Sequence, residues 1–319
     1  MVNKTLGFVF PGQGSQSVGM LTDIADEFPI VETTFAEASS VLGYDLWKLV
    51  QKGPAEELDK TVHTQPALLA AAYSIWRILT DETSLKPALL AGHSLGEYVA
   101  LVCANAISFS DGIRIVAARG RFMQEAAPVG VGGLAAIIGL EDAAVQDLCQ
   151  QSIMDDEILS PANFNCPGQV VIAGHLKAVE RALVLAKAQG AKLVKLLPVS
   201  VSSHCALMLP AAEKLAVLLE SVSISNPVIP VISNVDVLAY ATPVAIRDGV
   251  VRQLFMPVRW VETIQFFAAK GITDIVECGP GKVLNGLNKR IVRDMQLTNT
   301  ADLASLQALL ANPNRYTSI

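Results

Sequence analysis

The sequence predicts an α/β protein in which a parallel sheet covered by helices carries a small inserted domain. Short apolar runs alternate with helix-forming segments over most of the chain, which is typical of a parallel sheet. Between about residues 128 and 199 the predicted order changes to βαββαβ, the order of a split-βαβ, ferredoxin-like unit. We therefore expect a large domain formed by residues 1–127 and 200–319 and a small domain formed by residues 128–199.

The first part of the large domain begins with a buried strand at 5–10, which ends at a glycine-rich loop, 11–16. This loop is not a Walker A phosphate loop, because no Gly-Lys-Ser/Thr follows it. Helical patterns follow. The one at 65–80 is apolar on all sides and so should be buried. Ser110 is a candidate cap for the last of the predicted helices, which cover residues 20–26, 31–42, 54–60, 65–80, 97–104 and 111–126.

The small domain and the rest of the large domain show the same kind of patterns. In the small domain we expect strands at 133–140, 158–163, 169–173 and 192–197, with helices at 142–151 and 176–189. In the large domain we then expect a helix starting at Ser202 or Ser203, a strand at 228–232, a helix that begins at Thr242-Pro243, a strand at 272–277 and a helix at 282–293.

Composition and charge exclude several classes of protein. Among 319 residues, 51% are apolar and 17% are charged, which allows a sizeable core. The net charge of −6 argues against nucleic-acid binding, and no apolar run approaches the ~20 residues that a bilayer span requires. Five scattered cysteines without a C-x-x-C pair indicate neither a disulfide framework nor a zinc site. We expect a cytoplasmic protein, a monomer by default, with no metal and no membrane or nucleic-acid partner.

The residues 87–98 predict a nucleophile elbow. An apolar run ends in Gly92-His93-Ser94-Leu95-Gly96, and a helix-forming segment follows. This is the strand, tight turn and helix pattern that lifts a serine hydroxyl onto a strained turn. Ser94 is therefore the candidate nucleophile, and the alternative is a structural turn in which Ser94 only caps the helix.

A serine nucleophile needs a base, and the chain has four histidines. His93 should point to the other side of its strand, because side chains alternate, so we expect it to form a local hydrogen bond. His204 lies where the large domain resumes after the insertion and is the best candidate base. The alternative is a histidine at a helix start without a partner.

The base in turn needs an acceptor that orients it, and no acidic residue stands out. Gln253 offers another solution, because its helical hydrogen-bond donor would be residue 257, which is a proline without an N–H. The backbone carbonyl of Gln253 is then free to hold the His204 ring, unless it belongs to an ordinary frayed helix end.

Arg119 falls in the middle of the core-facing stripe of the predicted helix 111–126. A guanidinium in this position needs a carboxylate partner, either a buried Asp or Glu or a bound ligand. The helix pattern alone leaves both alternatives open. A tetrahedral oxyanion would need two further donors, and the N–H of Leu95 and the 12–14 loop are the candidates.

Taken together, several motifs resemble those of malonyl-CoA:acyl carrier protein transacylases. They run in order along nearly the whole chain, at residues 8–16, 92–98, 120–125, 163–165, 172–174, 199–208 and 277–281. The resemblance implies an α/β-hydrolase-like core with a ferredoxin-like insertion, and no cofactor. It implies that malonyl-CoA and acyl carrier protein are the substrates of a ping-pong transfer that supplies fatty acid synthesis.

The resemblance also implies a role for each candidate residue. The nucleophile falls on Ser94 and the base on His204, with the Gln253 carbonyl orienting the base. The oxyanion amides fall on Gln13 and Leu95, and Arg119 would grip the free carboxylate of the malonyl group.

Two questions stay open at this point, namely which related activity the chain has and which surface would bind the carrier protein. Val201-Ser202-Ser203 differs from the Val-Pro-Ser of many relatives and from the patterns that mark extender choice in polyketide-synthase acyltransferases. This departure leaves a freestanding polyketide acyltransferase as an alternative. A serine thioesterase or esterase, which would share Ser94 and His204 but have no use for Arg119, and a non-catalytic carrier-binding module are further alternatives. Docking of an acidic carrier would need a local basic patch. Its candidate residues are Lys177, Arg181, Lys187, Lys192 and Lys195 in the small domain, or Lys282, Lys289 and Arg290.

Overall fold

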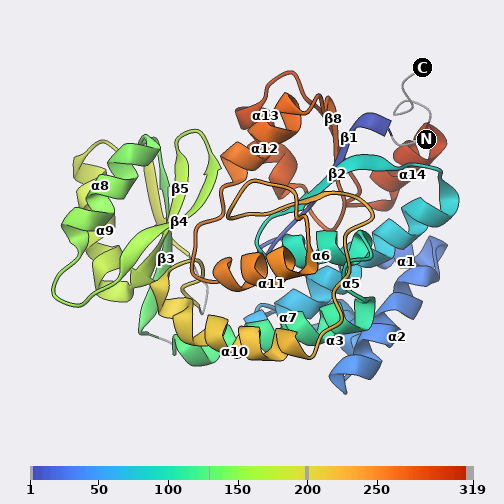
Figure 1. Ribbon diagram of the computed structural model, residues 1–319, viewed down its shortest axis with the longest axis horizontal. Coiled ribbons are helices and arrows are strands. Elements are labelled where there is room, and N and C mark those ends of the chain that lie inside the picture. Colours follow the sequence, from blue (N-terminus) through green and yellow to red (C-terminus); the bar gives the residue numbers. More distant parts are fainter. Residues whose placement is uncertain (1–2, 129, 198–200, 314–319) are drawn as a thin grey trace.

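The computed structural model describes residues 3–128, 130–197 and 201–313 and contains two sheets. One is a five-stranded parallel sheet in the order β7-β2-β1-β8-β9, and the other is a four-stranded antiparallel sheet in the order β4-β5-β3-β6. Figure 1 shows the antiparallel sheet with α8 and α9 on one side of the molecule, and the remaining helices around the parallel sheet. The parallel sheet is as predicted, whereas the predicted boundary between residues 199 and 200 lies outside the described residues.

The strands of the parallel sheet bring distant segments together. They are β1 (Asn3–Phe10), β2 (Pro87–Gly92), β7 (Val231–Ile232), β8 (Asp274–Glu277) and β9 (Gln296–Asn299). Phe10 pairs with Gly92, so the glycine-rich loop after β1 lies beside the elbow after β2. The antiparallel sheet contains β3 (Gly132–Ile138), β4 (Leu159–Cys166), β5 (Gln169–His175) and β6 (Leu193–Leu196).

Side chains of β1 point alternately to the two faces of the parallel sheet, and on each face they pack against helices. Phe8 and Phe10 belong to a core cluster with α5, α6 and α7, while Val9 belongs to a second cluster with α12 and α13. The helices are α1 (Thr22–Glu27), α2 (Ile30–Leu42), α3 (Leu46–Lys52), α4 (Ala55–Leu58), α5 (Thr61–Glu82), α6 (Leu95–Cys103), α7 (Phe109–Ala126), α8 (Asp142–Ser152), α9 (Leu176–Ala188), α10 (Leu209–Glu220), α11 (Pro243–Arg252), α12 (Trp260–Ala269), α13 (Val283–Ile291) and α14 (Leu303–Ala311).

The antiparallel sheet has one face covered by helices and one face turned toward the rest of the chain. Ile137 and Ile172 pack with α8 and α9, whereas Leu134 and Val171 lie on the other face and line a pocket. Backbone hydrogen bonds join β4 to the large domain, from Phe164 N to Val258 O and from Val258 N to Ala162 O. The small sheet is therefore attached directly beside the pocket.

Several predicted boundaries are wrong. The expected helix start at Ser202 or Ser203 is a turn, because His204 has φ +63°, and a 3₁₀ turn (Ala206–Met208) precedes α10. The strand expected at 228–232 forms only at β7, since Pro230 has no N–H to donate to a ladder. Ser108, rather than Ser110, caps α7. Four elements were not predicted, namely α3, α12, β9 and α14.

The structure of the described residues also bears on membrane spans, metal sites and disulfides. Among the helices of the described ranges, none combines bilayer-spanning length with enough apolar character. Within these ranges, no three His, Cys, Asp or Glu side chains gather where they could hold a metal ion. All five cysteines are buried and unpaired.

Candidate active site

Ser94 lies in a strained turn between β2 and α6. Its φ of +52° and ψ of −106° are far from the regions that a side chain normally prefers. The flanking glycines allow this turn. A Cβ on Gly92 would lie 1.8 Å from the Gly96 carbonyl carbon, and a Cβ on Gly96 would lie 2.1 Å from the Phe10 oxygen. The G-x-S-x-G spacing therefore follows from the close contact of strand and helix.

Hydrogen bonds from distant segments hold the Ser94 backbone. Its N–H donates to Asn234 Oδ1 over 2.8 Å, and its carbonyl accepts from Gln253 Nε2 over 2.9 Å. Asn234 Nδ2 also donates to the Gly92 carbonyl over 2.7 Å. These bonds satisfy the polar groups of a turn that would otherwise be costly to maintain.

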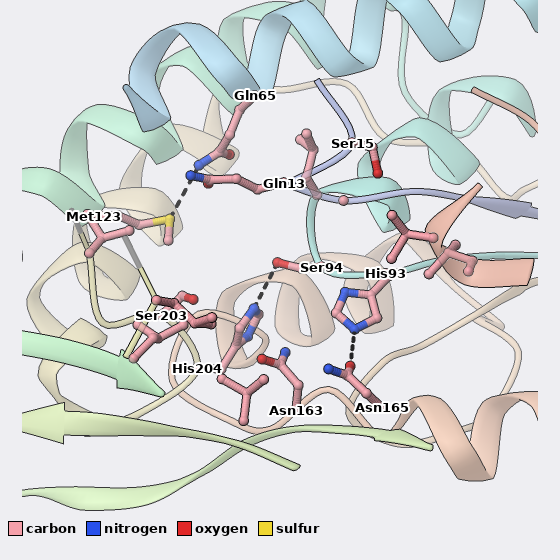
Figure 2. Close-up of a pocket in the computed structure, with 18 of the residues that line it drawn as sticks. Gln13, Ser15, Gln65, His93, Ser94, Met123, Asn163, Asn165, Ser203 and His204 are labelled. Atoms are coloured by element: carbon pink, nitrogen blue, oxygen red, sulfur yellow. Dashed lines mark hydrogen bonds between the residues drawn. The ribbon is translucent and has the colours of Figure 1, made fainter. Parts of the chain in front are cut away.

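His204 connects Ser94 to Gln253. Its Nε2 lies 2.8 Å from Ser94 Oγ, as Figure 2 shows, and its Nδ1 lies 2.7 Å from the Gln253 carbonyl oxygen. A carbonyl can only accept, so Nδ1 carries the proton and Nε2 is left to accept from the serine hydroxyl. Gln253 follows the last residue of α11, where the missing N–H of Pro257 leaves its carbonyl available.

The surroundings keep the His204 ring neutral. Burial lowers its pKa to about 3, and the nearby Arg119 charge acts in the same direction. At neutral pH this imidazole can therefore take a proton from the serine without first losing one.

Arg119 points from α7 toward Ser94 although its side chain is only 2% exposed. Its Nη2 donates to Ser94 Oγ over 3.3 Å and to Gln253 Oε1 over 2.9 Å, while Nη1 donates to Gln65 Oε1 over 2.8 Å. The guanidinium also lies over the Tyr98 ring, with 5.2 Å between the guanidinium carbon and the ring centroid.

No carboxylate neutralises this guanidinium by a direct ion pair within the described residues, and its Nε has no hydrogen-bond partner there. Burial lowers the pKa of Arg119, but a guanidinium remains protonated in proteins. Among the described residues, the buried Asp or Glu that the sequence left open as a partner therefore does not form a direct ion pair with Arg119.

The two candidate oxyanion donors, Gln13 and Leu95, line the same pocket. Leu95 is the first residue of α6, so its N–H has no partner inside the helix. Gln13 lies in the loop after β1, and its side-chain oxygen accepts from Thr61 Oγ1 over 3.1 Å. This contact holds the Gln13 side chain against α5.

The pocket has a volume of about 210 Å³ and lies between the two sheets. Polar groups occupy the end near Ser94, and apolar side chains from both domains form the rest. Figure 2 shows Met123 and Gln65 on one side and Asn163 and Asn165 on the other. His93 also lines this pocket, and its Nε2 lies 2.8 Å from Asn165 Oδ1 of β4, so its partner is distant in sequence. The apolar lining residues are Leu95, Met123, Leu134, Val171, Leu197, Val201, Val283, Leu284 and Leu287.

Sequence reasoning missed several residues of the site. Gln65, Asn234 and the side chain of Gln253 carry no local pattern that points to the pocket. Glu97 was detectable, because it is a lone acid followed by the apolar run 98–104 in a helix that should be buried.

The candidate basic residues differ in their surroundings. Arg181 forms an ion pair with Glu157 and donates to the Ser152 carbonyl, so it holds the small domain together. Arg290 Nη1 donates to Gln169 Oε1 over 2.8 Å. Lys282 is exposed and directly precedes Val283, which lines the pocket.

In this site a serine is hydrogen-bonded to a neutral imidazole and lies beside candidate oxyanion amides and a buried guanidinium. This arrangement is suited to acyl-group chemistry. The chain matches the acyl transferase domain family over residues 7–308 and belongs to this family. It is 57% identical over 303 residues to the malonyl CoA-acyl carrier protein transacylase of Salmonella typhimurium, covering 95% of this chain and 98% of the relative. It is 55% identical to the protein of the same name from Escherichia coli, with the same coverage.

Solved structures agree with these similarities. An acyl carrier protein S-malonyltransferase from Vibrio cholerae superimposes with a TM-score of 0.93 at 55% identity, over 96% of this chain and 99% of that one. A malonyl-transacylase in complex with its type II PKS acyl-carrier protein superimposes with a TM-score of 0.94, at the same identity and coverage.

Proposed function

We propose that this protein transfers the malonyl group from malonyl-CoA to the phosphopantetheine thiol of acyl carrier protein, through a malonyl-Ser94 intermediate. The observation that carries this proposal is the Arg119 guanidinium, 3.3 Å from Ser94 Oγ and without an ion-pair partner among the described residues. A planar guanidinium binds a carboxylate with two parallel hydrogen bonds, and malonyl differs from acetyl by such a carboxylate. The names of the relatives support the same substrates.

In the first half-reaction Ser94 Oγ attacks the thioester carbonyl carbon while His204 Nε2 takes the hydroxyl proton. The Gln253 carbonyl stabilises the imidazolium through Nδ1–H. The N–H groups of Gln13 and Leu95 would stabilise the tetrahedral oxyanion. When the C–S bond breaks, His204 returns the proton to the sulfur of coenzyme A, which leaves as a thiol.

In the second half-reaction the phosphopantetheine thiol gives its proton to His204 Nε2 and attacks the malonyl ester carbonyl. The C–O bond to Ser94 breaks, and the proton returns to Ser94 Oγ. Arg119 holds the carboxylate through both steps, so the acyl group keeps its orientation while the thiols exchange. This chemistry is complete with side chains and the two substrates, and we propose that no cofactor takes part.

We also propose that the core is α/β-hydrolase-like and that residues 128–199 form a ferredoxin-like domain inserted between 1–127 and 200–319. The parallel sheet with its elbow after β2 supports the first assignment. The order β4-β5-β3-β6, with helices on one face, supports the second. Five buried, unpaired cysteines are consistent with a reducing compartment, and we place the enzyme in the cytoplasm.

The decisive experiment is to mix the protein with radiolabelled malonyl-CoA and to follow the label on the protein. We expect a labelled protein that loses its label to holo acyl carrier protein, and no labelled protein with Ser94→Ala. Absence of label on the wild-type protein would reject the acyl-enzyme and leave a non-catalytic carrier-binding role.

The same experiment separates the alternative enzymes. A serine thioesterase or esterase would release free malonate to water at least as fast as it loads the carrier. A polyketide acyltransferase would prefer a polyketide carrier over a fatty-acid carrier when the two compete for the labelled protein. We expect transfer to dominate over hydrolysis and the fatty-acid carrier to be preferred.

A further inference from the structure

Glu97 is a buried acid that the proposed mechanism does not use. It lies in the first turn of α6, three residues after Ser94, and its side chain is 0% exposed. Burial raises its pKa to about 7, although hydrogen bonds from Tyr240, Gln253 and Asn234 act in the opposite direction. Burying a carboxylate is costly unless its hydrogen bonds compensate, so its partners indicate what the acid does.

The two oxygens of Glu97 have different partners. Oε1 accepts from Tyr240 Oη over 2.5 Å and from the backbone N–H of Asn234 over 3.3 Å. Oε2 accepts from Gln253 Nε2, which also donates to the Ser94 carbonyl. Glu97 therefore contacts the residues that hold the Ser94 turn and that orient His204.

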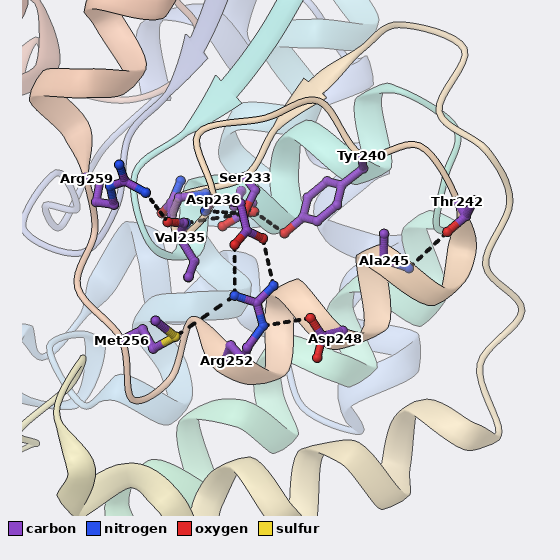
Figure 3. A network of polar contacts seen from close by, with 12 residues as sticks. Ser233, Val235, Asp236, Tyr240, Thr242, Ala245, Asp248, Arg252, Met256 and Arg259 are labelled. Carbon is purple, nitrogen blue, oxygen red and sulfur yellow. Dashed lines mark hydrogen bonds and ion pairs between the residues drawn. The ribbon is translucent and has the colours of Figure 1, made fainter.

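The main chain beside Gln253 has a further anchor besides Glu97. Figure 3 shows the neighbouring residue Arg252 between two carboxylates. Its guanidinium donates to both oxygens of Asp236, over 3.0 and 2.7 Å, and to Asp248 over 2.6 Å. This clamp joins the end of α11 to the loop after β7. The orientation of the Gln253 side-chain amide is then the remaining variable.

Glu97 Oε2 accepts a hydrogen bond from the Gln253 amide and so favours one of the two orientations of that amide. With the Gln253 NH₂ group facing Glu97 and the Ser94 carbonyl, the amide oxygen faces Arg119 and accepts from Nη2 over 2.9 Å. In the flipped orientation two donor groups, the amide NH₂ and the guanidinium, would face each other. Glu97 and the Ser94 carbonyl thus both favour the orientation that gives Arg119 its second anchor beside Gln65.

We propose that Glu97 is a positioning residue that acts through the Gln253 side chain to set the Arg119 guanidinium for the carboxylate of the acyl group. This inference rests on the proposed function, because it concerns the recognition of malonyl. It predicts that the acceptor pattern of Glu97 matters more for malonyl than for acetyl, which has no carboxylate for Arg119 to bind.

Glu97→Gln tests this with almost no change of shape. With its oxygen kept toward Tyr240 and the N–H of Asn234, the new amide turns its NH₂ group toward the Gln253 NH₂ group and removes one of the two acceptors that favour the Gln253 orientation. Loss of one anchor of a charged group should raise KM for malonyl-CoA by roughly ten- to a hundredfold, with a smaller change in kcat. Acylation of Ser94 by acetyl-CoA, measured with the same label assay, should stay within about threefold of wild type.

Glu277→Gln is the matched control, because Glu277 is also 0% exposed but accepts from the backbone N–H groups of Leu284 and Asn285. It should lower the thermal midpoint and leave the ratio of malonyl to acetyl acylation unchanged. An unchanged ratio in Glu97→Gln as well would show that Glu97 only supports the fold, and would overturn the inference.

Gln253→Met covers the case in which Glu97→Gln does not fold. It keeps the backbone carbonyl that holds His204 and removes only the side-chain amide. It should lose malonyl preference, and retention of wild-type preference would overturn the inference. A wild-type protein that shows no preference for malonyl over acetyl would instead reject the proposed function itself, so the two failures are distinguishable.

Discussion

Replacing Arg119 with methionine tests the substrate proposal most directly. Methionine keeps an apolar chain of similar length and removes the guanidinium, which contacts Ser94 Oγ, Gln65 and Gln253. Removing one partner of a buried charge pair costs about 3–5 kcal/mol, because the other charge is left uncompensated. At about 1.4 kcal/mol per factor of ten, kcat/KM for malonyl-CoA should fall by roughly two to four orders of magnitude.

The assay compares Ser94 acylation by labelled malonyl-CoA and acetyl-CoA in single-turnover experiments. With acetyl-CoA the Arg119→Met variant should react as fast as wild type or faster, because no carboxylate has to enter the site. Arg121→Met is the control, since this arginine lies on the same helix with a side chain that is 63% exposed. A parallel loss with both acyl groups in Arg119→Met, or an unchanged malonyl preference, would refute the role of this guanidinium.

Further predictions concern His204, two glycines and Lys282. Because the pKa of His204 is lowered to about 3, acylation at saturating malonyl-CoA should persist as the pH falls from about 7 to about 5, and a tenfold fall per pH unit below about 6.5 would contradict a neutral base. The unfolded His204 binds a proton below about pH 6.5 that the folded one excludes, so this residue should lower the free energy of unfolding toward acid by at most about 1.4 kcal/mol per pH unit, measured by denaturant titration. Gly92→Ala should destabilise the fold by about 3 kcal/mol or more, since its Cβ would lie 1.8 Å from the Gly96 carbonyl carbon. Gly286→Ala, with no atom within 4 Å, should instead stabilise α13 by about 0.5–1 kcal/mol in the same denaturation experiment. Lys282→Glu should raise KM for acyl carrier protein several-fold at low salt and less at high salt, and equal KM values at low salt would remove Lys282 from the docking surface.

The fold was predictable wherever local patterns determine it. Apolar runs that end at glycine predicted β1 and β2 to within a few residues, and their alternation with helices predicted a parallel sheet. The failures have tertiary causes. His204 takes a left-handed conformation because its N–H donates to the Leu254 carbonyl, which no local pattern around Ser202 reveals. The strand β9 has four residues and lies at the edge of the sheet beside β8, so it is too short to show the alternation that identifies strands.

The candidate site was predictable to a different degree for each residue. Ser94 has a pattern of its own because the elbow needs glycines at fixed spacing. Arg119 stood out as a charge on a core-facing stripe, but its partner stayed open, since helical periodicity places a residue on a face and says nothing of what lies opposite. The Gln253 side chain could not be predicted, because its role depends on four groups that are distant in sequence: Ser94, Glu97, Arg119 and Asn234.

The strained residues of the site explain why these distant groups are needed. Ser94 and His204 both have positive φ, and such conformations cost of order 1–3 kcal/mol each for residues other than glycine. The turn at Ser94 is held by Asn234 and Gln253, and the turn at His204 by the Leu254 carbonyl and the Gln253 carbonyl. The segment 234–254 thus offsets the strain of both reacting residues at once. A substitution in this segment should change stability and acyl transfer together, whereas one at Arg119 should separate the two.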